Sequence, residues 1–96
     1  MKTDQLISML NQYKKTHSRQ YGIKRLGLFG SIAKGTSNDQ SDIDIVVELE
    51  RQDLFFLIGI KQDLEEQLHS KVDIVSYRNN MNPFLRQRID QEALYA

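Results

Sequence analysis

A hydrophobic run, Ile23-Lys24-Arg25-Leu26-Gly27-Leu28-Phe29, leads directly into Gly30-Ser31-Ile32-Ala33-Lys34-Gly35. A hydrophobic segment that ends in glycine is typical of a strand that breaks into a tight turn. At such a turn, glycine lets the backbone approach a ligand, while free N–H groups and a serine hydroxyl can hold phosphate oxygens. The sequence therefore predicts that Gly30 and Ser31 contact phosphate, with the positive charge of Lys34 within reach.

Two acidic residues follow this junction. Ten residues, 32–41, separate Ser31 from Asp42, and Asp44 lies two positions further on. The alternating, β-branched residues of 43–49 predict a strand, so Asp42 and Asp44 would share one face with their Cα atoms roughly 6–7 Å apart. Two carboxylates at this spacing can converge on a hard cation such as Mg²⁺, or bracket a pair of ions. The apolar residues between and after them would then face the core: Ile43, Ile45 and Val47.

Each feature also has an ordinary structural explanation. Asp-Ile-Asp alone is compatible with an edge strand whose carboxylates face water. Gly30 alone could mark a common turn, and Lys34 could be a solvated surface charge. The combination at this spacing instead favours metal-assisted phosphoryl transfer, which needs both carboxylates and a phosphate cradle.

Gly30-Ser31, ten further residues and Asp42-Ile43-Asp44 resemble the signature of the DNA polymerase β-like nucleotidyltransferase superfamily. Residues 31–35 and 41–44 resemble its minimal nucleotidyltransferase branch, and the resemblance covers most of the chain. It implies that Asp42 and Asp44 bind Mg²⁺ and that a third carboxylate on a neighbouring strand completes the site. Asp73, between apolar residues in 72–75, takes that role, although it could also be a strand-end residue facing water. Lys34 stands where the branch often has arginine, and lysine holds phosphate as a point charge instead of a planar fork.

The resemblance further implies transfer of AMP from ATP, with two Mg²⁺ ions, to the hydroxyl of a protein partner. Members of the branch pair with a small helical HEPN-type protein as the antitoxin half of a toxin–antitoxin pair. They are similar to protein adenylyltransferases that modify a tyrosine of that partner. One alternative is a catalytically weak module that neutralises a partner by forming a complex. Another is a small-molecule nucleotidyltransferase, which is disfavoured because the chain offers no acceptor domain.

Composition narrows the classes of partner. Ninety-six residues predict one domain, 1–96. Thirteen basic and thirteen acidic residues balance, so no general charge draws the chain to nucleic acid or an anionic membrane. No apolar run approaches the roughly 20 residues of a membrane span, and no signal peptide is apparent, so the expected location is the cytoplasm. Cysteine is absent, which excludes disulfides and thiolate metal sites. The sequence leaves open whether the chain forms a homo-oligomer or a hetero-oligomer.

Periodicity predicts the remaining elements. We expect a helix over 4–18 with Thr3 as its N-cap, a short helix over 31–34, a helix over 53–69 and a last helix that begins at Asn82-Pro83. We expect strands at 23–29, 42–49 and 71–76, with a polar loop at 35–41. This order predicts an α/β fold in which helices flank a small mixed β-sheet.

Overall fold

The computed structural model describes residues 2–35 and 42–96. The helices are α1 (Thr3–Tyr21), α2 (Gly30–Lys34), α3 (Leu54–Leu68) and α4 (Pro83–Glu92). The strands are β1 (Ile23–Phe29), β2 (Ile43–Leu49), β3 (Val72–Ser76) and β4 (Leu94–Tyr95). The predicted polar loop lies mostly at 36–41, outside the described residues. Within the described part of the chain, no helix is long and apolar enough to cross a membrane.

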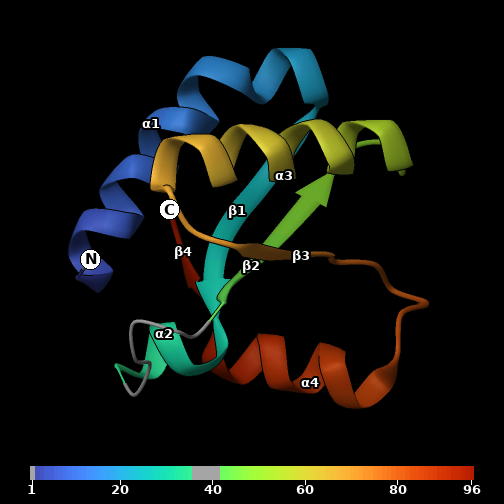
Figure 1. The fold of residues 1–96 in the computed structure, drawn as a ribbon. Helices are drawn as coiled ribbons and strands as arrows, with labels where there is room; N and C mark the ends of the chain where they lie inside the picture. Colours follow the sequence, from blue (N-terminus) through green and yellow to red (C-terminus); the bar gives the residue numbers. More distant parts are fainter. Residues whose placement is uncertain (1, 36–41) are drawn as a thin grey trace.

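The strands form one mixed sheet in the order β3-β2-β1-β4 (Figure 1). β1 runs antiparallel to both β2 and β4, whereas β2 and β3 are parallel. The parallel pair is possible because α3 carries the chain from one end of the sheet back to the other. The predicted α/β fold with a small mixed sheet is therefore confirmed.

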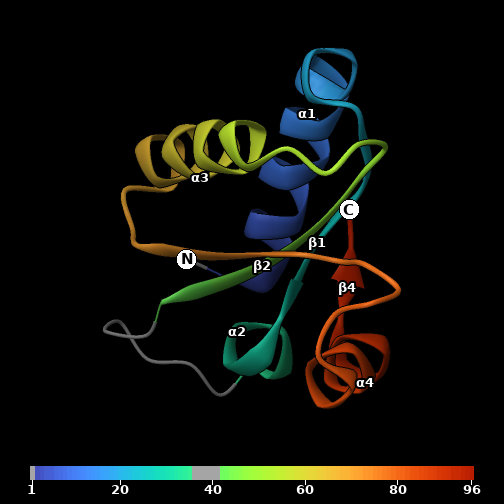
Figure 2. The same ribbon diagram turned by 90° about the vertical axis from the view of Figure 1, so that its right-hand side faces the viewer.

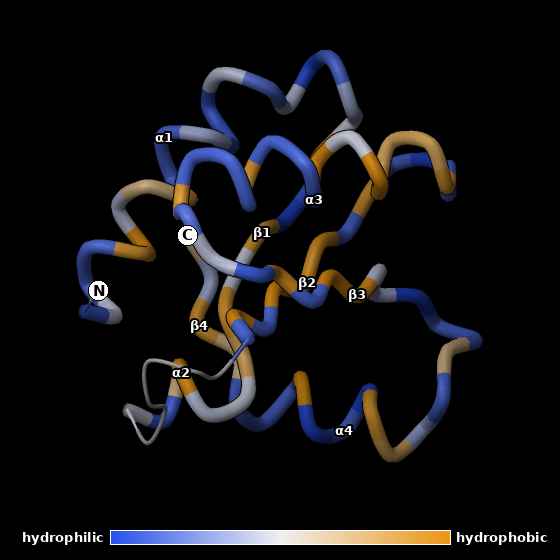
Figure 3. The backbone as a smooth tube through the Cα atoms, in the orientation of Figure 1, coloured by the Kyte–Doolittle hydropathy of each residue, from blue (hydrophilic) through white to orange (hydrophobic). Residues whose placement is uncertain are grey.

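One face of the sheet packs on α1 and α3, which lie on the same side of it in Figure 2. Ile43, Ile45 and Val47 are buried in this core, as predicted. Figure 3 shows the corresponding hydrophobic colour along the central strands. The two helices are also joined by Tyr13, whose hydroxyl donates to Asp63 Oδ2 at 2.8 Å.

The opposite face of the sheet carries a second, smaller core beneath α4. Phe29 and Val46 from the sheet pack there against Met81 and Ile89. Val46 lies two residues after Asp44, so the alternation of β2 places both side chains on the face that α4 covers. The docking of α4 therefore determines what lies over the predicted site.

Helix starts were predictable where a side chain caps the first turn. Asn82 caps α4 by accepting from Phe84 N and Leu85 N at 2.9 and 3.3 Å, with proline at the first helical position, as expected. The prediction for Thr3 was wrong, because Lys2 is the N-cap of α1. The Thr3 hydroxyl instead donates to Ile32 O of α2 at 3.0 Å, a tertiary contact that local sequence does not reveal.

Candidate active site

The strand-to-helix turn predicted after Phe29 is present. Gly30 is buried and adopts a left-handed φ of 73° as the first residue of α2, and the partly buried Ser31 follows it. A Cβ atom on Gly30 would collide with Asp44 Oδ2 and stand 3.3 Å from Arg88 Nη2. Glycine is thus required here both by its backbone conformation and by the space between two charged groups.

The sheet register brings two of the predicted carboxylates together. Asp44 pairs with Asp73 across the parallel ladder of β2 and β3, and with Phe29 across the antiparallel ladder of β1 and β2. Directly paired residues point to the same face of a sheet, and neighbouring strands lie about 4.8 Å apart. Asp42 immediately precedes β2 and is exposed, on the face that strand alternation gives it with Asp44. Phe29, Asp44 and Asp73 therefore form a row that ends at the Gly30 turn.

The electrostatics of Asp44 reflect this crowding. Burial raises the pKa of the Asp44 carboxyl, and the negative charge of Asp73 raises it further. Asp42 and Glu92 act in the same direction more weakly, whereas the guanidinium of Arg88 opposes them. A cation bound at this point would relieve the repulsion between the carboxylates.

The donor set of the site suits a hard metal, because it consists of carboxylate oxygens. In residues 2–35 and 42–96, however, no group of three or more histidine, aspartate or glutamate side chains is arranged to hold a metal ion. Binding of Mg²⁺ by Asp42, Asp44 and Asp73 thus stays a prediction, and it requires these side chains to turn toward a shared ion.

The positive side of the site comes from α2 and α4. The ammonium of Lys34, predicted to reach phosphate, forms an ion pair with Glu92 Oε1 at 2.7 Å. Arg88 Nε contacts the other oxygen of the same carboxylate, Glu92 Oε2, at 3.2 Å. The hydrogen bond from Lys34 is the main reason why the pKa of Glu92 is lowered. Sequence reasoning missed Arg88 and Glu92, whose only local signal is their spacing of four on a helix.

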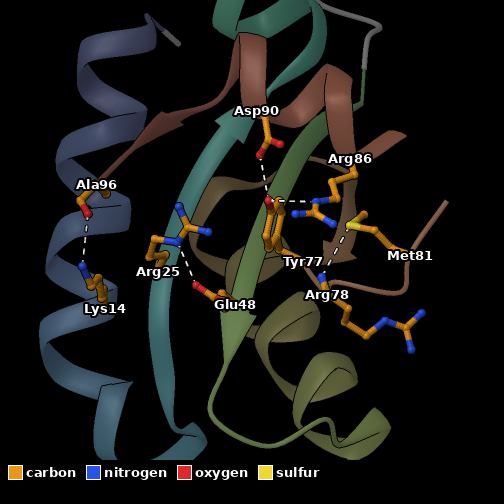
Figure 4. A network of polar contacts seen from close by, with 9 residues as sticks. All are labelled: Lys14, Arg25, Glu48, Tyr77, Arg78, Met81, Arg86, Asp90 and Ala96. Carbon is orange, nitrogen blue, oxygen red and sulfur yellow. Dashed lines mark hydrogen bonds and ion pairs between the residues drawn. The ribbon is translucent and has the colours of Figure 1, made fainter. Parts of the chain in front are cut away.

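A polar and aromatic network fixes α4 on the sheet (Figure 4). The Tyr77 hydroxyl donates to Asp90 Oδ1 at 2.8 Å and accepts from Arg86 Nε at 3.3 Å. Arg25 pairs with Glu48 at 2.8 Å, and its guanidinium lies 5.0 Å from the ring centre of Tyr77. By holding α4, this network sets the position of the charged residues on its last turns.

A groove of about 520 Å³ lies elsewhere, between the start of α3, β3 and the start of α4. Leu57, Ile74 and Leu85 are among its lining residues. None of the predicted site residues lines it, so this groove is separate from the carboxylates.

The chain is similar to known nucleotidyltransferases in sequence and in structure. Residues 11–95 match the family model described as Polymerase beta, Nucleotidyltransferase. A candidate protein adenylyltransferase of Methanocaldococcus jannaschii is 42% identical over 76 residues, which cover 78% of this chain and 81% of that protein. A solved structure of a candidate minimal nucleotidyltransferase is 32% identical, with a TM-score of 0.80 over 98% of this chain and 95% of that one. A toxin–antitoxin structure with AMP-PNP is 30% identical, with a TM-score of 0.72 over 90% of this chain and 72% of that one.

Proposed function

The chain belongs to the Polymerase beta, Nucleotidyltransferase family, and we propose that it transfers AMP from ATP to a tyrosine hydroxyl of a HEPN-type toxin, which it thereby neutralises. The observation that carries the proposal is the row of Asp44 and Asp73 beside the Gly30 turn. The similarity to a candidate protein adenylyltransferase and to a toxin–antitoxin structure with AMP-PNP supports the acceptor class and the nucleotide.

In the proposed reaction, the acceptor oxygen forms a bond to the α-phosphorus of ATP while the bond to the β-phosphate oxygen breaks and pyrophosphate leaves in line. Asp42, Asp44 and Asp73 would hold Mg²⁺, which when bound neutralises phosphate charge and makes the acceptor hydroxyl more acidic. Asp73, the more exposed member of the strand pair, would accept the proton of that hydroxyl. The Gly30 turn and the Ser31 hydroxyl would cradle the two phosphates that leave.

The direct test uses the chain together with a HEPN-type protein as the acceptor. Incubation with Mg-ATP should increase the intact mass of the partner by one or more adenylyl groups. The variant carrying both Asp42→Asn and Asp44→Asn should leave the partner's mass unchanged. An equal mass gain with that variant would refute the assignment of the carboxylates.

A second candidate function is neutralisation by complex formation alone. It is favoured by large apolar side chains exposed beside the groove, with Phe55 at the start of α3 82% exposed and Phe84 on α4 83% exposed. Figure 3 shows this hydrophobic colour at the start of α3. Neutralisation of the toxin at full strength by the doubly substituted chain, without any mass change, would support this alternative.

A further inference from the structure

Arg88 reaches the Gly30 turn from a helix far away in the sequence. Its Nη2 atom lies 3.3 Å from the point where a Cβ on Gly30 would stand, and its guanidinium lies 5.7 Å from the ring centre of Phe29. The same vacant Cβ position borders the carboxylate of Asp44. The guanidinium and this carboxylate therefore both lie against the Gly30 backbone, so closely that only glycine fits there.

The contacts of Arg88 leave its Nη2 atom beside the Gly30 turn. The Nε atom donates to Glu92, while Nη2 is the atom beside Gly30. Glu92 also holds Lys34 of α2, and Figures 1 and 2 show α2 and α4 on the same side of the sheet. One carboxylate thus fixes two cations, one on each helix, beside the turn.

A purely structural role explains less of this arrangement. The side chain of Arg88 is 50% exposed and that of Glu92 is 15% exposed, so solvent screens the arginine side of this ion pair and its contribution to stability is small. Such a pair would form equally well with the guanidinium facing water. Its placement at the glycine turn instead puts the Nη2 end of a planar guanidinium, a group suited to phosphate oxygens, beside the predicted phosphate cradle.

We propose that Arg88 is a phosphate-binding residue of the nucleotide site, which contacts the two phosphates of ATP that leave as pyrophosphate. This inference rests on the proposed function, because it assumes that a nucleoside triphosphate binds at the Gly30 turn. It adds a residue that lies outside the Gly-Ser and Asp-x-Asp motif. The guanidinium compensates the negative charge that accumulates on the leaving group.

The test compares the affinities for Mg-ATP and for AMP by calorimetry. Arg88→Gln should weaken Mg-ATP binding by about tenfold or more, the usual effect of losing a charged hydrogen bond, while the affinity for AMP stays at the wild-type value. Arg88→Lys keeps the charge without the planar fork and should give an intermediate loss. Arg51→Gln is the matched control, because Arg51 is exposed and follows β2 at the end away from Asp44; it should bind Mg-ATP as the wild type does.

Each outcome decides the question. If the wild type binds Mg-ATP and Arg88→Gln binds it equally well, the inference is wrong while the proposed function stands. Equal losses in Arg88→Gln and Arg51→Gln would indicate a general charge effect and would also overturn it, as would a parallel loss of AMP affinity. Should thermal melting show that Arg88→Gln does not fold, Arg88→Lys decides by the same comparison. If the wild type binds no Mg-ATP, the proposed function falls first and the inference with it.

Discussion

Replacing Asp44 by asparagine should stabilise the protein when no metal is bound. Asparagine has nearly the same shape, so it occupies the space beside Gly30 without the charge that faces Asp73. Two unit charges about 5 Å apart repel by about 0.8 kcal/mol in water and about 3 kcal/mol at an effective dielectric constant of 20. Asp44 is half-exposed and Arg88 attracts it, so solvent screening and the lost attraction reduce the expected gain to about 0.5–1 kcal/mol.

The assay is thermal melting in the presence of a chelator. A gain of this size should raise the melting temperature of Asp44→Asn by about 2–8 °C in a domain of this length. The pKa of Asp44 is higher in the folded state, so the native protein binds more protons and loses stability as pH rises from about 4 through that raised pKa. The difference between variant and wild type should therefore be small below about pH 4 and complete at neutral pH.

Glu66→Gln removes the same charge from an exposed position of α3 and serves as the control, with little change in melting temperature. A variant Asp44→Asn that melts at or below the wild type at neutral pH would refute the reasoning. A gain that persists undiminished at low pH would refute it as well, because the carboxylate is then neutral in both states. Saturating Mg-ATP should reverse the order, since the wild type gains stability by binding.

Three further outcomes are expected. Calorimetry should show ATP binding only with Mg²⁺ or Mn²⁺, and equal affinity after addition of a chelator would exclude the carboxylates as metal ligands. Ser31→Ala should fold normally and lose about 1.5–3 kcal/mol of ATP binding energy, whereas unchanged affinity and turnover would assign the hydroxyl to the turn alone. Gly30→Ala should lower both the melting temperature and the midpoint of denaturant unfolding, because φ is 73° and the new Cβ meets Asp44. A variant as stable as the wild type would contradict this.

Local signals were enough to place most of the elements. The strand 23–29 was predicted with the bounds that β1 has, because turn residues flank a hydrophobic run. The start of α4 followed from Asn82 and Pro83, whose capping role depends on residues within one turn. β4 was missed because Leu94 and Tyr95 form a very short strand that exists through its pairing with Gly27 and Leu28. Tertiary pairing of two residues leaves no periodicity to detect.

The residues of the candidate site also fall into two groups, those that local sequence reveals and those that only tertiary packing brings to the site. Gly30, Ser31 and the Asp42–Asp44 spacing are local and could be recognised in the sequence, and Asp73 could be nominated by resemblance. That Asp73 stands directly beside Asp44 depends on the register of two parallel strands joined by α3, which the sequence does not fix. Arg88 could not be nominated at all, since its approach depends on how α4 docks.

The negatively and the positively charged groups of the site belong to different layers of the fold. The carboxylates of Asp44 and Asp73 lie on the sheet, whereas Lys34 and Arg88 belong to helices that Glu92 links. The network of Tyr77, Asp90 and Arg86 fixes α4 at some distance from the reacting groups. A change in that network would shift the cations relative to the carboxylates without altering any residue of the motif. The geometry at the Gly30 turn therefore depends on how α4 packs on the second core as well as on the motif itself.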